Sequence, residues 1–202
     1  MNRRACTPLH LLTRRFVCGL LGLLLVVCVA TSSAAGQSVP PPLRSAILLK
    51  AAGYENGLAQ RSGDVVIAVV QGSSGASLQD GKAVAATLIA LLKKTRIGGR
   101  PGHVVQITHA SSDETATKLR EQKAEVIYFA AGLEGIAAEV PAKEGSVRRI
   151  VACSDGSQVK DGCVLGVELD GEKPRLVVNL KRANAVGLRF QPELLRLARI
   201  VR

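Results

Sequence analysis

Aromatic residues are scarce in this chain of 202 residues, which has two tyrosines, three phenylalanines and no tryptophan. The core must therefore be built mainly from valine, leucine, isoleucine and alanine, and few side chains remain to stack on bases or sugars. The chain also lacks the Gly-x-Gly-x-x-Gly fingerprint, a phosphate-binding loop ending in Gly-Lys-Ser/Thr, and the Gly-x-Ser-x-Gly nucleophile elbow. These absences favour a non-enzymatic protein with no cofactor.

The formal net charge is +11, and four of the arginines lie among the first 15 residues. Removing these four leaves +7 for the remainder, in which acidic and basic residues are interspersed and no run of lysine or arginine exceeds two. This pattern indicates a solvated basic surface and gives no support to a nucleic-acid partner.

The N-terminal segment 1–35 has the layout of a secretory signal peptide. A basic stretch over 1–15 precedes an apolar stretch over 16–30, and the small residues of 31–35 are suitable for cleavage near Ala35. We expect export to the periplasm. Both ordinary and twin-arginine export remain open, and an unremoved N-terminal anchor is the alternative.

Cleavage would leave a proline-rich linker over 36–42, a single domain over 43–202, and two cysteines, Cys153 and Cys163. We expect these to form a structural disulfide in an oxidising compartment, and closing so short a loop would contribute about 2–3 kcal/mol. The alternatives are weaker, because a redox-active pair favours Cys-x-x-Cys spacing and a metal site needs further ligands nearby.

Strand and helix patterns alternate from residue 65 onward. The apolar run 65–70 predicts a strand buried on both faces, and further strands are expected over 104–108, 125–131 and 147–153. Because strands joined by crossover helices form parallel sheets, we predict a three-layer α/β fold of flavodoxin-like or binding-protein-lobe type. Its mostly parallel sheet would be extended by a C-terminal antiparallel hairpin and covered by terminal helices.

Helices are expected on both sides of these strands. Apolar residues spaced by three or four predict an amphipathic N-terminal helix that ends near Gln60; they are Leu43, Ile47, Ala51, Tyr54 and Leu58. A second helix runs through Val84 to Leu92. Ser111 and Glu114 have capping-box spacing at the start of a third, and a fourth stops at Pro141.

The C-terminal part begins with two β-branched runs, 164–169 and 175–179, separated by the turn residues 170–174, which predicts the hairpin. Asn179 is a suitable N-cap for a short helix that Gly187 would close. Pro192 would then open a final helix. One face of that helix would carry Leu194, Leu197, Ala198 and Val201, and the other Arg196, Arg199 and Arg202.

The same segment carries a family resemblance. A strand ending in Val178-Asn179-Leu180 is followed by Ala183, Gly187-Leu188 and the run 194–198. This succession resembles the YfiR family of small exported bacterial proteins, and the similarity continues back to about Leu48.

The resemblance implies a periplasmic regulator that binds the external part of a membrane signalling protein, typically a diguanylate cyclase, and restrains it. Redox or envelope stress releases such inhibition and changes cyclic di-GMP output. A histidine kinase is an equally compatible partner, and dimeric, disulfide-dependent relatives imply a homodimer. The alternative hypothesis is a single-lobe periplasmic binding protein that captures a small solute.

Two sets of candidate site residues follow. In open α/β sheets ligands bind at the carboxyl ends of the strands, which places Ser73, Ser74, His109 and Asp155 at a candidate ligand crevice. A Ser-His-Asp arrangement can be drawn from them, although ordinary loop positions explain them equally. The candidate partner surface is Tyr54, in a segment that is aromatic-rich in the resembled family, together with Arg196 and Arg199.

Overall fold

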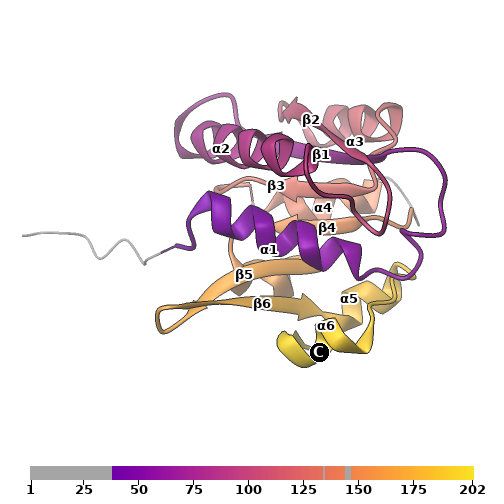
Figure 1. Cartoon of the computed structure of the whole chain (residues 1–202). Coiled ribbons are helices and arrows are strands. Elements are labelled where there is room, and N and C mark those ends of the chain that lie inside the picture. The colour runs from indigo at the N-terminus through magenta and orange to yellow at the C-terminus, as the bar shows by residue number, and fades with distance from the viewer. Residues whose placement is uncertain (1–37, 134, 144–146) are drawn as a thin grey trace, which may run out of the picture. The chain divides into compact units, whose positions relative to one another are not determined.

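The computed structural model describes residues 38–133, 135–143 and 147–202 (Figure 1). The expected signal peptide, 1–35, lies outside this range. The described residues form one compact unit. Within the described ranges, no helix is both long enough and apolar enough to cross a bilayer.

Seven strands form one sheet in the order β2-β1-β3-β4-β5-β6-β7. They are β1 (Val65–Gln71), β2 (Gly102–Thr108), β3 (Val126–Phe129), β4 (Ile150–Cys153), β5 (Leu165–Asp170), β6 (Lys173–Asn179) and β7 (Arg199–Val201). The first five pair in parallel, whereas β6 runs antiparallel to β5 and carries β7 parallel to itself. The order 2-1-3-4-5 of the parallel strands is the flavodoxin-like order, so the predicted fold class is confirmed.

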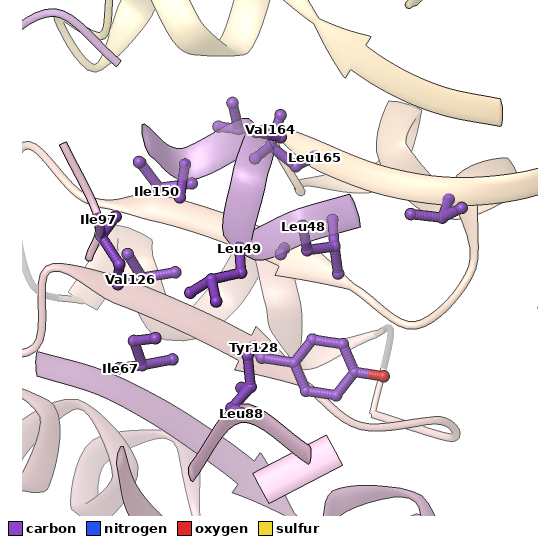
Figure 2. Packing of buried hydrophobic residues seen from close by; sticks show 14 of the residues in the cluster. Leu48, Leu49, Ile67, Leu88, Ile97, Val126, Tyr128, Ile150, Val164 and Leu165 are labelled. Carbon is purple, nitrogen blue, oxygen red and sulfur yellow. The ribbon is translucent and has the colours of Figure 1, made fainter. Parts of the chain in front are cut away.

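Helices cover both faces of the sheet. They are α1 (Pro41–Gly53), α2 (Gly75–Leu92), α3 (Ser112–Glu121), α4 (Ile136–Lys143), the 3-10 helix η1 (Gly156–Asp161), α5 (Leu180–Ala185) and α6 (Pro192–Leu197). Alternate residues of β1 divide the core: Ile67 and Val69 join the cluster under α1 and α2, while Ala68 and Val70 join the cluster under α3 and α4. Figure 2 shows Leu48 and Leu49 of α1 lying over Val126 and Tyr128 of the sheet. The fully buried β1 therefore has apolar neighbours on both sides, as its sequence predicts.

The N-terminal helix differs from its prediction in length and in orientation. It ends at Gly53, and its buried face is centred on Arg44, Ser45, Leu48, Leu49 and Ala52, which leaves Leu43 43% exposed. Beyond Gly53 the chain leaves the helix to pair with the C-terminal segment. Asn56 N–H donates to the Arg189 carbonyl at 2.9 Å, and Gln191 N–H donates to the Tyr54 carbonyl at 3.0 Å. This long-range pairing outweighs the local helical periodicity.

The prediction of the final helix is wrong beyond Leu197, where α6 ends. Ala198 has extended backbone angles, and Arg199–Val201 forms β7 beside β6 instead of continuing the helix. Because the helix stops, Leu197 is 76% exposed and does not share a buried face with Val201. The neighbouring β-branched residues at 200 and 201 fit a strand that completes the sheet.

Two predicted helix caps are present, but one predicted helix end is not. Asn179 caps α5 as expected, since its side chain accepts a hydrogen bond from Arg182 N–H at 2.8 Å. Ser111 likewise caps α3 by accepting from Glu114 N–H at 3.3 Å. Pro141, however, lies inside α4 and does not end it. The hairpin loop contains only Gly171 and Glu172, because Asp170 pairs with Lys173.

Candidate functional site

The four residues of the candidate crevice lie at the carboxyl edge of the sheet, but the structure does not join them. His109 N–H donates to the Gln71 carbonyl at 2.8 Å, and its ring Nδ1 lies 2.8 Å from Thr115 Oγ1. Ser73 and Ser74 are exposed in the loop before α2, and exposed Asp155 accepts a hydrogen bond from Ser157 N–H at 2.9 Å. Among the described residues no hydrogen bond links these four side chains, so no Ser-His-Asp arrangement is assembled here.

A buried ion pair lies at this edge instead. Arg44, from α1, binds the carboxylate of Asp80, from α2. The other oxygen of that carboxylate accepts from the Tyr128 hydroxyl at 2.9 Å and from Ala131 N–H at 3.0 Å. Arg44 also donates to the Ser154 carbonyl at 3.1 Å. The Arg44–Asp80 pair thereby ties α1 and α2 to each other and to the segments that follow β3 and β4.

The side chains of this cluster are largely buried, and burial affects the pKa of Tyr128. The side chain of Arg44 is 4% exposed and that of Asp80 11% exposed. Burial raises the pKa of Tyr128 well above its ordinary value, while the positive charge of Arg44 opposes this rise. The phenol therefore stays neutral at physiological pH and donates a hydrogen bond to Asp80. The guanidinium carbon of Arg44 also lies 5.8 Å from the centroid of the Tyr128 ring, a cation–π distance.

Three buried polar atoms on these elements have no hydrogen-bond partner within the described residues: Arg44 Nε, Ser45 Oγ and Gln71 Oε1. Ser45 and Tyr128 also line an apolar cavity of about 20 Å³ between α1, α2 and the sheet. A cavity of that size holds one water molecule at most, whereas solute sites occupy roughly 300–1,000 Å³.

The amino edge of the sheet holds a second arginine cluster. Arg100 forms a bidentate pair with Glu125, with nitrogen–oxygen distances of 2.8 and 3.0 Å. The same guanidinium donates to the carbonyls of Leu58, Ser62, Gly63 and Asp64 at 2.9–3.1 Å. Arg61 adds a third contact to Glu125 at 3.0 Å. These contacts join the three segments that precede β1, β2 and β3.

The residues of the candidate partner surface lie in three separate segments. Tyr54 is half-buried in a surface groove of about 490 Å³ formed by α1, the end of α2 and Gln191. Arg196 is exposed on α6. Arg199 lies in β7, where it binds the Glu168 carboxylate, with Nη2 donating to Oε2 at 2.7 Å, and this hydrogen bond raises the pKa of Arg199. The predicted arginine stripe along a final helix is therefore not present.

The expected disulfide is formed between Cys153, at the end of β4, and Cys163, just before β5. Both residues are buried in the cluster under α3 and α4. Gly162, with φ +143°, passes so close to Ala138 that a Cβ at this position would clash with α4. Across the described part of the chain, no group of three His, Cys, Asp or Glu residues is placed to hold a metal ion.

A scan against protein families matches residues 42–199 to the family described as YfiR/HmsC-like. The chain belongs to the YfiR/HmsC-like family. This confirms the resemblance, which the C-terminal segment carries and which continues back to about Leu48; the match itself begins at residue 42. A search of curated proteins finds no match.

Several solved structures have a similar fold. The YfiR/HmsC-like chain matches an ABC domain in complex with L-Trp from Streptococcus pneumonia with a TM-score of 0.57 and 15% identity, over 80% of this chain and 60% of that one. It matches a conserved domain protein from Vibrio cholerae with a TM-score of 0.54 and 16% identity, over 81% and 60%. A ligand-free substrate binding protein with adhesive properties from Clostridium difficile gives a TM-score of 0.50 and 14% identity, over 68% and 54%. The chain thus spans about 60% or less of the length of these proteins, and the likeness concerns the fold.

Sequence reasoning missed the Arg44, Asp80 and Tyr128 cluster of this family member. One signal was available, because Arg44 is the only charged residue in the first two turns of α1 and Asp80 the only acid on α2. An arginine in the otherwise uncharged first turns of one helix, and a single acid on another helix, favour a buried pair.

Proposed function

We propose that this YfiR/HmsC-like protein is a non-enzymatic periplasmic regulator that binds the external domain of a membrane signalling protein, a diguanylate cyclase or a similar sensor, and restrains it. The family match over residues 42–199 carries this proposal. The buried disulfide is in keeping with an exported protein in an oxidising compartment.

The carboxyl edge of the sheet supports the same function. In open α/β sheets a solute binds at this edge, and here Arg44 occupies part of it and is bound by Asp80 and the Ser154 carbonyl. A protein whose own side chains fill that position is better suited to presenting an outer surface to a partner than to enclosing a solute.

Restraint requires a difference in affinity between two states of the partner. A regulator that binds the inactive state about 100-fold more tightly shifts the equilibrium by about 2.7 kcal/mol toward inactivity. Opening the disulfide would destabilise the regulator and release the partner, which is how a redox signal would act. A homodimer would present two such binding surfaces.

The test uses the tagged protein as its own cells export and process it. Purified from the periplasm, it should capture a membrane protein with an external sensing domain from detergent-solubilised membranes. Deleting its gene should raise cyclic di-GMP or the output of the captured sensor. Recovery of no membrane protein, together with unchanged output after deletion, would falsify the regulator proposal.

A second candidate function, a single-lobe solute-binding protein, is favoured by the fold shared with the substrate binding protein from Clostridium difficile. A solute at 100 times its dissociation constant stabilises the folded state by about 2.7 kcal/mol, so a screen of amino acids and other small solutes should then raise the melting temperature. A rise of several degrees with one solute, and no membrane partner, would favour this function over the regulator.

A further inference from the structure

The groove that contains Tyr54 has an apolar floor and a basic rim. We call it the basic groove, and its lining residues are Ala46, Leu49, Lys50, Gly53, Tyr54, Leu91, Thr95, Arg96, Gly98 and Gln191. Leu49 is 6% exposed and Leu91 is partly buried, so both contribute apolar surface at the bottom. Lys50 and Arg96 are exposed. The volume of about 490 Å³ is large enough for one or two side chains of another protein.

The charge around the basic groove is of one sign. No acidic residue occurs in α1, and none occurs between Asp80 and Asp113, whereas Lys93 and Lys94 directly follow α2, close in sequence to the groove residue Arg96. Within the described residues none of Lys50, Lys93, Lys94 and Arg96 forms an ion pair; the ion pairs on these elements involve other residues.

Acidic residues of the neighbouring segments do not neutralise this rim. Glu55 follows Tyr54 directly, but its carboxylate is buried and bound by Arg148. Glu193 lies on α6, two residues beyond the groove residue Gln191, and within the described residues it forms no ion pair with Lys50 or Arg96. The rim therefore keeps several uncompensated cations around an apolar hollow, which is complementary to an apolar side chain flanked by carboxylates.

We propose that the basic groove binds a short acidic segment of the partner's external domain. An apolar side chain of that segment sits on Leu49 and Leu91, and carboxylates on either side pair with Lys50 and Arg96. This inference rests on the proposed function, since it names where the membrane signalling protein docks. A bilayer surface fits less well, because proteins that bind bilayers insert protruding apolar side chains, and the apolar residues here form the floor of a hollow.

The first experiment identifies what occupies the groove. The full-length chain, carrying the photo-crosslinking residue p-benzoylphenylalanine at Tyr54, is produced in its own cells and irradiated, and the crosslinked peptide is sequenced by mass spectrometry. A crosslinker at Val105 on β2, outside the groove, is the control. We expect the Tyr54 adduct to map to a segment of a membrane protein's external domain that holds an apolar residue beside aspartate or glutamate.

The second experiment measures affinity with a synthetic peptide of that segment. Charge reversal in the variant K50E/R96E should weaken binding on the order of tenfold or more, because two attractive contacts become repulsive. The matched variant K160E/K173E changes the net charge equally at two exposed residues outside the groove and should bind within about twofold of the wild type. Ala46→Trp, which fills the groove without altering charge, should also abolish binding. Urea unfolding of each variant checks that the fold is kept.

Three results would overturn docking at the basic groove, and they have different consequences for the regulator function. If K50E/R96E still captures the membrane protein as well as the wild type, docking is elsewhere and the regulator function stands. If the wild type captures no membrane protein at all, the regulator function fails and the docking site with it. If the wild type crosslinks to no protein but sediments with phosphatidylglycerol vesicles, and K50E/R96E does not, the groove region is a bilayer contact.

Discussion

A buried arginine lies at each edge of the sheet, but the two arginines differ in how many of their nitrogens are hydrogen-bonded. At the amino edge, Arg100 donates to Glu125 and to four backbone carbonyls. At the carboxyl edge, Arg44 binds Asp80 and two carbonyls, and its Nε has no partner within the described residues. The guanidinium of Arg100 is thus fully bonded, whereas that of Arg44 is not. The carboxyl edge, where related folds bind ligands, keeps polar groups that its own contacts do not use.

The largest effect is expected from breaking the amino edge. Arg100→Met should lower the free energy of unfolding by about 3–5 kcal/mol, because Glu125 would remain largely buried without its main partner. Urea denaturation measures this. Arg61→Met is the matched control, since the Arg61 side chain is 36% exposed, and it should cost less than about 1 kcal/mol. Equal costs for the two variants would mean that Arg100 is not the centre of this cluster.

The next effect concerns the disulfide at the opposite edge. Replacing Cys153 and Cys163 by alanine together should cost about 2–3 kcal/mol, because the unfolded chain would no longer be constrained by the closed loop. The same loss should follow when the wild type is unfolded with a reductant present. If the double variant were as stable as the oxidised wild type, the bond would have no structural role and a redox role would gain weight.

A double-mutant cycle sharpens the comparison at the carboxyl edge. Arg44→Met alone should cost about 2 kcal/mol, less than Arg100→Met, because Asp80 keeps its bonds from Tyr128 and from Ala131 N–H. Adding Asp80→Asn removes the unpaired charge, so the double variant should recover part of the loss, with a coupling energy of about 1–3 kcal/mol. Strictly additive costs would show that the two side chains do not stabilise each other.

The smallest effect is a pH dependence at Tyr128. Its pKa is raised in the folded protein by burial, while an unfolded tyrosine ionises near pH 10. Its contribution is therefore complete below about pH 10 and is lost as pH rises further, by up to about 1.4 kcal/mol per pH unit. Comparing Tyr128→Phe with the wild type between pH 8 and 11 isolates this group. A stability difference that does not change above pH 10 would contradict the assignment.

The sequence predicted features that depend on neighbouring residues along the chain. The buried run of β1, the Asn179 cap and the alternation of strands with helices all express local patterns, and together they were enough to predict the sheet class. The features that failed depend on distant contacts. Arg44 faces the core because it forms an ion pair with Asp80 there. Arg199 lies in a strand because its segment pairs with the edge of β6 and Glu168 binds its guanidinium.

The candidate sites divide in the same way. The position of Ser73, His109 and Asp155 at strand ends follows from the topology, but no local pattern reveals that His109 bonds Thr115 instead of a serine. The basic groove was not predictable either, because it needs α1, the end of α2 and Gln191 side by side. Only Tyr54 was singled out, and its neighbours in the groove come from three separate parts of the chain.

The pairing of residues 54–56 with residues 189–191 has a consequence for how the protein matures. This contact joins the two ends of the domain across more than 130 residues, with Asn56 bound to Arg189 and Gln191 bound to Tyr54. A ribosome releases the chain N-terminus first, so the segment after α1 waits for the last helices before it can settle. Such late closure slows folding. Were the chain exported unfolded, this delay would help to keep it unfolded until transport is complete.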